Sequence, residues 1–139
     1  MTDADLIRFL DAHDPIYQQV VEELANGRKE THWMWFIFPQ IAGLGFSETS
    51  RFYALKDLKE AAGFLEDPVL GSRLVNISRE LLKLKTNDAH RVFGSPDDLK
   101  LKSSMTLFSM VPGADPAFQQ VLEKFFHGEK DTKTLQLIS

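Results

Sequence analysis

The stretch "DPVLGSRLVNISRELLKL", residues 67–84, carries the pattern from which the fold can be inferred. An aspartate stands directly before a proline, and leucine or isoleucine then recurs every three or four residues. The aspartate oxygen can accept a hydrogen bond from a free N–H of the first helical turn, where proline has no donor to lose. The stretch therefore predicts an amphipathic helix over 68–84 whose apolar face packs on a core.

The same helix signals recur on both sides of this stretch. Three more capping residues precede a proline: Asp14-Pro15, Ser95-Pro96 and Asp115-Pro116. Three glycines are placed to end helices in a left-handed conformation: Gly27, Gly94 and Gly128. With the apolar stripes between them, these signals predict helices over 3–12, 15–26, 48–54, 57–65, 68–84, 87–93, 96–110, 116–127 and 132–137. We therefore expect an all-α fold, a single compact multi-helix domain over residues 1–139.

The aromatic segment "HWMWFIF", residues 32–38, allows two local structures. Thr31 could cap a short helix that ends before Pro39, because the residue before a proline avoids the helical region. Its aromatic and β-branched side chains would also suit one short buried strand near 33–38. We favour the helix.

The amino-acid composition excludes several classes of function. The 139 residues are 43% hydrophobic and 26% charged, which is typical of a globular domain. A net charge of −4 lacks the basic field that double-stranded nucleic acid requires, although it leaves room for a local basic pocket. The absence of cysteine excludes disulfides and thiolate chemistry, and the four histidines lack the spacing of a metal site. We expect no metal and no other cofactor.

The chain shows no targeting or membrane signal. Its first residues, "MTDADLIRFLDAHD", are acidic and amphipathic and do not resemble a signal peptide. No apolar run approaches the roughly 20 residues needed to cross a bilayer. We expect a cytoplasmic protein without a membrane partner.

A first candidate binding site follows the aromatic segment. In "PQIAGLGFSE", Gly43 and Gly45 permit a close approach of the backbone, and Gln40 offers an amide. Ser47 caps the next helix, whose first N–H groups suit an anion. Ser50, Arg51 and Tyr53 lie on that helix, and an exposed face of Trp33 or Trp35 could stack on a planar ligand. The alternatives are an aromatic core, an ordinary turn with an N-cap, and a surface ion pair for Arg51.

A second polar cluster lies in "SPDDLKLKSSMTLFSM", residues 95–110. On a helical projection Lys100 and Ser104 fall near the middle of the apolar arc with Ser103 close by, and Leu99 and Met110 form one flank of that arc. Lys102, Asp98 and Thr106 fall on the solvent side. A buried ammonium needs a partner or a polar cavity, and Asp97, one turn earlier, could pair with Lys100. Alternatively, Lys100 reaches the surface at the helix end, and the two aspartates serve the helix N-terminus.

These motifs resemble a known bacterial family. The segments "HWMWFIFPQIAGLGFSETSRFYAL", "DPVLGSRL", "VFGSPDDLKLKSSMTLF" and "FQQVLEKFFHGEKDTKTLQLI" resemble the family called domain of unknown function 1810. The family is often labelled calpastatin, but nothing in the chain resembles the disordered inhibitory repeats of calpastatin. The resemblance implies a mainly α-helical domain and no particular reaction. The family pattern points to Trp33, Trp35, Pro39, Gln40, Gly43, Gly45, Ser47, Ser50, Tyr53, Gly71, Arg73, Asp97, Lys100, Ser103, Ser104 and Thr106.

A fainter similarity of arrangement links the chain to the YbiA-like family of NAD and ADP-ribose chemistry. There too an aromatic and polar segment precedes a helical lysine motif, and that family implies cleavage of N-glycosidic bonds in ribose derivatives. Such cleavage needs a group that stabilises an oxocarbenium ion or activates water. Asp97 and Glu48 are the carboxylates that we consider for that role.

Together these residues favour a small-molecule enzyme or binder for a nucleotide-, NAD- or ADP-ribose-like ligand. Trp33 or Trp35 would stack on a base. The phosphate would be held by Gly43, Gly45, Ser47 and Arg51, with help from Arg73. Lys100, with Asp97, Ser103 and Ser104, would contact the ribose or act in acid–base catalysis. The alternative is a non-enzymatic protein-interaction or structural module.

Overall fold

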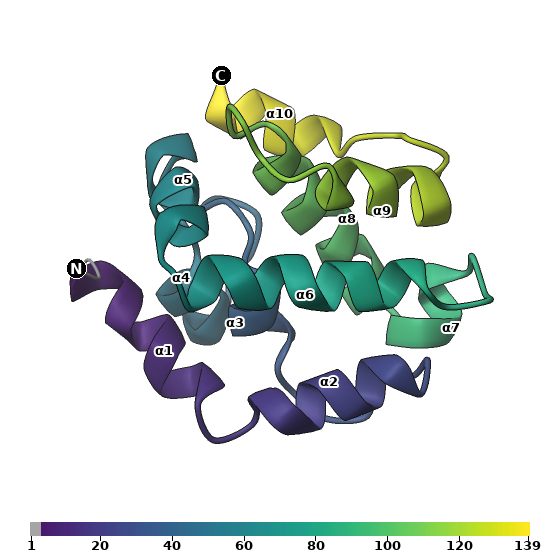
Figure 1. Cartoon of the computed structure of the whole chain (residues 1–139). Helices are drawn as coiled ribbons and strands as arrows, with labels where there is room; N and C mark the ends of the chain where they lie inside the picture. Colours follow the sequence, from purple (N-terminus) through teal and green to yellow (C-terminus); the bar gives the residue numbers. More distant parts are fainter. Residues whose placement is uncertain (1–3) are drawn as a thin grey trace.

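Ten α-helices and one preceding turn of 3-10 helix build residues 4–139, the part of the chain that this computed structural model describes (Figure 1). In chain order they are η1 (Ala4–Leu6), α1 (Ile7–His13), α2 (Tyr17–Ala25), α3 (Met34–Ile37), α4 (Glu48–Tyr53), α5 (Leu58–Glu66), α6 (Leu70–Leu82), α7 (Ala89–Phe93), α8 (Asp97–Ser109), α9 (Ala117–Phe126) and α10 (Thr132–Ile138). No β-strand occurs among these residues, so the expected all-α fold is confirmed. Within the same range, no helix has the length and apolar character to span a membrane.

The predicted helices are present, and apart from the start of the first, where α1 begins at Ile7 after η1, their ends differ from the prediction by at most two residues. The first of them, over 3–12, begins at a residue that lies outside the described range. The aromatic segment forms the short helix α3, so the helix is confirmed and the strand near 33–38 is wrong. Thr31 does not cap it, because the Thr31 hydroxyl donates instead to the Glu23 carboxylate at 2.7 Å.

Two of the four capping residues that precede a proline act as predicted. Oδ1 of Asp67 accepts hydrogen bonds from the backbone N–H groups of Val69 and Leu70, at 2.9 and 3.0 Å, where α6 begins. Oδ1 of Asp115 accepts one from the N–H of Ala117, at 2.8 Å, where α9 begins. These bonds satisfy N–H groups that have no partner within the helix.

The other two capping predictions are wrong. Asp14 ends α1 with its own backbone N–H, and its carboxylate pairs with Arg73 of α6 at 3.3 Å. The helix α8 begins after Pro96 without a side-chain cap, so Ser95 does not cap it as predicted. In place of a Ser95 cap, the backbone N–H of Asp98 donates to the carbonyl oxygen of Gly94 at 2.9 Å.

Helix α8 is the central helix, packed against α5, α7, α9 and α10 (Figure 1). The predicted division of its surface is wrong, because Leu99 and Met110 are 60% and 40% exposed and Thr106 is fully buried. Thr106 is covered because its hydroxyl accepts a hydrogen bond from the N–H of Asp131, at 2.9 Å, just before α10. A helix that neighbours surround on several sides has no single apolar stripe.

Four phenylalanines connect the helices through the core. The ring centroids of Phe9 and Phe64 lie 5.1 Å apart, those of Phe64 and Phe108 5.5 Å, and those of Phe108 and Phe118 5.8 Å. This row joins α1, α5, α8 and α9, and aromatic pairs at such distances add to the apolar burial. Helices α5 and α6 pack closely at Gly71, where a Cβ would lie 2.1 Å from the carbonyl oxygen of Leu65.

Candidate functional site

The glycine loop, residues 39–47, is held against the segment that follows α4. The N–H of Ala42 donates to the carbonyl of Leu55 at 2.7 Å, and the N–H of Leu55 donates to the carbonyl of Gln40 at 2.9 Å. These bonds form a single parallel bridge between Ile41 and Leu55, both of which are buried. Residues 40–55 therefore form a closed loop that carries α4 on the surface.

Both glycines of this loop are required by their contacts. A Cβ at Gly45 would lie 2.5 Å from the Cβ of Ser50, far inside van der Waals contact. Gly43 has φ of +105°, and a Cβ there would lie 3.2 Å from the side chain of Leu137 in α10. The predicted close approach of the backbone is thus an approach to α4 and α10.

A cavity of about 100 Å³ lies between the glycine loop and α4. Seven of the predicted ligand-binding residues line it: Trp35, Gln40, Gly43, Gly45, Ser50, Arg51 and Tyr53. Sites that enclose a whole ligand typically measure about 300–1,000 Å³, so this cavity accommodates one small group or a few water molecules.

The two motifs meet at Trp35. The ammonium nitrogen of Lys100 lies 5.0 Å from the centroid of the Trp35 ring, within the range of a cation–π contact. Oδ1 of Asp97 lies 3.5 Å from the same nitrogen, so the expected pairing of these two residues is confirmed. The side chain of Lys100 is 21% exposed, which places its charge at the boundary between the protein and solvent.

Lys29 completes this cluster, although no sequence pattern marked it. Its ammonium nitrogen lies 3.0 Å from Oδ2 of Asp97 and 5.1 Å from the centroid of the Trp33 ring. Its side chain is only 8% exposed. Both oxygens of Asp97 therefore face a lysine, and Asp97 links the loop before α3 to α8.

Trp33 belongs to the core. It is 1% exposed, and its indole N–H donates to Oε1 of Glu23 at 2.9 Å. The same oxygen accepts the backbone N–H groups of Glu30 and Thr31. Burial opposes ionisation of Glu23, but these hydrogen bonds outweigh it and lower its pKa to about 2. Of the two tryptophans, only Trp35 lies where a ligand can reach it.

A buried histidine orients the aromatic segment. Nε2 of His13 donates to the carbonyl oxygen of Phe36 at 2.6 Å, while Nδ1 has no hydrogen-bond partner among residues 4–139. Burial lowers the pKa of His13 to about 4, although the bond to Phe36 favours the charged form. His13 is therefore neutral at neutral pH and joins α1 to α3.

The remaining predicted site residues lie away from the cavity lining. Ser47 caps α4, where its hydroxyl accepts the N–H of Ser50 at 3.1 Å. Arg73 of α6 pairs with Asp14 and lies over the ring of Tyr17. The Ser103 hydroxyl donates to the carboxylate of Asp131 at 3.2 Å.

Ser104 lies deeper still. It is fully buried, and its hydroxyl oxygen has no partner within the described residues. The second polar cluster thus contributes Lys100 and Asp97 to the surroundings of Trp35, whereas its hydroxyl groups face α10 or the core.

The lining of the cavity is rich in residues that can donate hydrogen bonds, a composition suited to a polar or anionic group. Its lining includes the Gln40 amide, the Ser50 and Tyr53 hydroxyls and the Arg51 guanidinium, but no carboxylate and no histidine. No hydrogen bond or ion pair engages the Arg51 side chain within residues 4–139, so the alternative of a surface ion pair finds no partner in that range. Across the same residues, no group of three or more potential ligands is arranged to hold a metal ion.

Comparisons with known proteins agree on the family and the fold. Residues 3–138 match the sequence model of a family described as a protein of unknown function, DUF1810. The crystal structure of the conserved hypothetical protein Rv1873 from Mycobacterium tuberculosis is similar to this chain, with a TM-score of 0.94 and 43% sequence identity over 96% of each chain. No protein with a curated description matches the chain.

Proposed function

The chain belongs to the DUF1810 family, whose description names no activity, and we propose from the site itself that the protein binds a nucleotide-, NAD- or ADP-ribose-like ligand beside Trp35. The observation that carries this proposal is the position of Trp35. Its ring lines the cavity and also contacts Lys100, so an aromatic surface, a cation and several hydrogen-bond donors lie together.

Each part of such a ligand has a suitable partner. One small group, a ribose hydroxyl or an amide, enters the cavity and bonds to Gln40, Ser50 or Tyr53. A phosphate outside the cavity pairs with Arg51, whose planar guanidinium suits phosphate oxygens. Lys100 adds a second positive charge across the Trp35 ring.

The same chemistry favours binding over cleavage. N-glycosidic hydrolysis needs an acid, a base or an oxocarbenium-stabilising group at the reacting atoms. The cavity lining provides no carboxylate, and Asp97 is engaged with Lys29 and Lys100. Cleavage through Asp97 and Lys100 stays a prediction of the sequence, and the assay below tests it separately.

Calorimetry and thermal shift on the purified chain test this proposal. NAD, ADP-ribose, ribose 5-phosphate, mononucleotides and free bases are compared on the wild type, Ala42→Leu, which fills the cavity, and Lys100→Gln. A ligand at about 100 times its dissociation constant should stabilise the fold by about 2.7 kcal/mol, a shift of several degrees. We expect a ribose-containing ligand to give this shift in the wild type and neither variant to respond to it.

The control is Lys59→Gln, which removes one exposed positive charge from α5, outside the cavity lining. Equal binding by Lys59→Gln and the wild type, with loss in Ala42→Leu, supports the site. Unchanged binding in Ala42→Leu contradicts it. Release of a free base from NAD or ADP-ribose, abolished by Asp97→Asn, would show that the protein is a hydrolase.

Two exposed phenylalanines within residues 40–55 favour a second candidate function, a protein-interaction module. Phe46 is 81% exposed and directly follows the cavity residue Gly45, and Phe52 of α4 is 58% exposed. Large apolar side chains of this kind often contact a protein partner. Self-association of the wild type that is lost in Phe46→Ser/Phe52→Ser, measured by sedimentation, would support an interaction module.

A further inference from the structure

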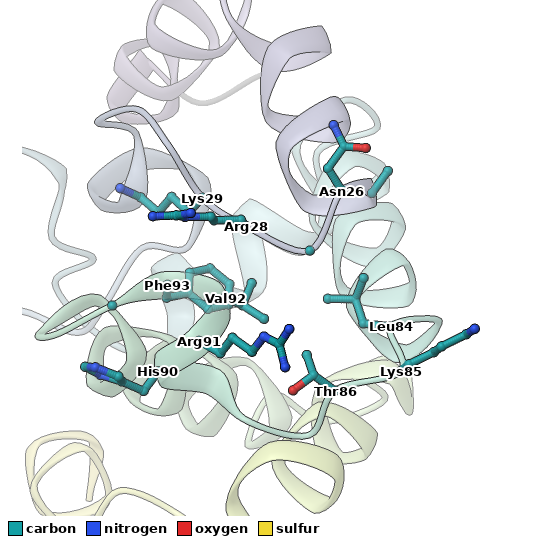
Figure 2. Close-up of a pocket in the computed structure, with 13 residues that line it drawn as sticks. Asn26, Arg28, Lys29, Leu84, Lys85, Thr86, His90, Arg91, Val92 and Phe93 are labelled. Carbon is teal, nitrogen blue, oxygen red and sulfur yellow. The ribbon is translucent and has the colours of Figure 1, made fainter.

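A basic groove lies on the side of the molecule formed by the C-terminal end of α2 and by α7 (Figure 2). Its volume is about 850 Å³, which falls within the range of about 300–1,000 Å³ that is typical of ligand sites. One wall is the segment Ala25–Lys29, and the other is formed by residues 84–86 and 90–94. A backbone hydrogen bond of 2.7 Å from Lys29 to Val92 holds the two walls together.

The charge of this groove is opposite to that of the whole chain. Four cationic side chains and one histidine line it, and no carboxylate does: Arg28, Lys29, Lys85 and Arg91, with His90. The chain carries a net charge of −4, so this concentration of cations is a local feature. A cleft lined by charge of one sign raises the local concentration of ions of the opposite sign.

Three of these cations have no acidic partner among residues 4–139. Neither an ion pair nor a side-chain hydrogen bond engages Arg28, Lys85 or Arg91 there. The fourth, Lys29, pairs with Asp97 at 3.0 Å, and the His90 ring lies 3.6 Å from the carboxylate of Asp98. Two arginines without an acidic partner in the described residues thus line a groove whose lining contains no carboxylate.

The arrangement of the walls suits a ligand that is anionic at more than one point. Figure 2 shows Arg28 and Arg91 on facing walls, with Val92 and Phe93 between them. Val92 and Phe93 are 1% and 6% exposed, so the floor is apolar and the charge is at the rim. A cation on each wall can hold one phosphate of a ligand that spans the groove.

A structural role for the cations is the alternative. Arg28 and Lys29 follow the C-terminus of α2, Lys85 follows that of α6, and Arg91 lies in the last turn of α7, where positive charge stabilises a helix. This role explains why the residues are basic but not why two helix ends and α7 enclose a groove without carboxylates.

We propose that the basic groove is a second binding site, separate from the Trp35 cavity, for a small molecule with at least two adjacent phosphate groups. Arg28 and Arg91 bind the phosphates from opposite walls, and Lys85 adds charge at the rim. The proposal does not depend on the function of the Trp35 cavity.

Calorimetric titration with inorganic tripolyphosphate tests this site, together with amide chemical-shift mapping on the 15N-labelled chain. We expect binding to the wild type, with shifts concentrated in residues 26–29 and 84–94. The double variant Arg28→Gln/Arg91→Gln removes two charge-assisted contacts. It should therefore bind tripolyphosphate at least about tenfold more weakly than the wild type. The charge-retaining Arg28→Lys/Arg91→Lys should keep most of the affinity and shows whether charge alone is sufficient.

Lys56→Gln/Lys59→Gln is the matched control, because it removes two exposed charges from the region where α5 begins. Equal weakening in this control and in Arg28→Gln/Arg91→Gln would mean non-specific attraction and overturn the proposal. The cavity variant Ala42→Leu should bind tripolyphosphate normally, whereas loss in that variant would place the anion at Trp35 instead. Absence of binding, or much tighter binding of a single-stranded oligonucleotide than of tripolyphosphate, also overturns it.

Discussion

The indole N–H of Trp33 donates a 2.9 Å hydrogen bond to Oε1 of Glu23, at a point where Trp33 is 1% and Glu23 is 6% exposed. Glu23 also accepts the backbone N–H groups of Glu30 and Thr31 and the Thr31 hydroxyl. One carboxylate of α2 therefore holds both the loop before the aromatic segment and the first tryptophan of that segment.

Replacing this carboxylate by an amide should destabilise the fold. Glu23→Gln keeps one acceptor oxygen but presents N–H groups to the Thr31 and Gln19 donors, so we expect a loss of about 1–3 kcal/mol in the free energy of unfolding at pH 7. Urea denaturation measures it. Glu22→Gln, at the neighbouring exposed position, should change stability little.

The stabilisation by Glu23 should also depend on pH. Its pKa is lowered from 4.5 to about 2 in the folded chain, so the contribution is present above pH 4.5 and is lost as the pH falls toward 2. The difference between wild type and Glu23→Gln should therefore shrink over that range. A constant difference would contradict the role of the charged form.

His13 predicts a separate pH dependence at higher pH. Its pKa is lowered from 6.5 to about 4, so the unfolded chain binds the proton more tightly than the folded chain does. The contribution of neutral His13 to the free energy of unfolding is therefore fully present above pH 6.5. The free energy of unfolding should fall by up to about 3 kcal/mol as the pH decreases from 6.5 to 4. Denaturant midpoints across this range measure the decrease.

The variant His13→Gln should flatten that dependence, because glutamine does not titrate and its side-chain N–H can still donate to the Phe36 carbonyl. The control His32→Gln changes an exposed histidine and should retain the dependence of the wild type. A wild-type curve that is flat between pH 6.5 and 4 would contradict a buried neutral His13.

Removal of the Asp97 charge should cost stability through Lys29. Asp97→Asn leaves a lysine whose side chain is 8% exposed without a counter-charge, so we expect a loss of about 1–3 kcal/mol. The double variant Asp97→Asn/Lys29→Met should recover part of this loss if the two residues are coupled. Asp98→Asn is the control, and an equal loss in that variant would indicate a general helix effect.

The two glycines Gly45 and Gly63 should respond in opposite directions to alanine. Gly45→Ala places a Cβ 2.5 Å from that of Ser50 and should destabilise by about 1–3 kcal/mol, with recovery in Gly45→Ala/Ser50→Gly. Gly63, within α5, has open space around it, and Gly63→Ala should stabilise by about 0.5–1 kcal/mol. Thermal melts of the three variants measure both effects.

Local patterns predicted the helices well because helix formation depends on near neighbours. The apolar stripe after Asp67 and the positive φ of Gly27, +75°, are set by contacts within a few residues. The same reasoning failed on α8, where Thr106 is buried and Leu99 exposed. The faces of a central helix depend on which helices surround it, and α10 covers Thr106 through Asp131.

The candidate site likewise has a part that local sequence predicted and a part that depends on how the helices pack. The amino-acid sequence alone predicted the helices and identified the segment from Trp35 to Tyr53 as a candidate binding site. It could do so because aromatic, glycine and capping residues act on their immediate neighbours. The contact of Lys100 with Trp35, the pairing of Lys29 with Asp97, and the gathering of Arg28 and Arg91 around one groove join residues distant in sequence. Such contacts exist because the helices pack around a shared core, and no local pattern encodes which surfaces that packing brings together.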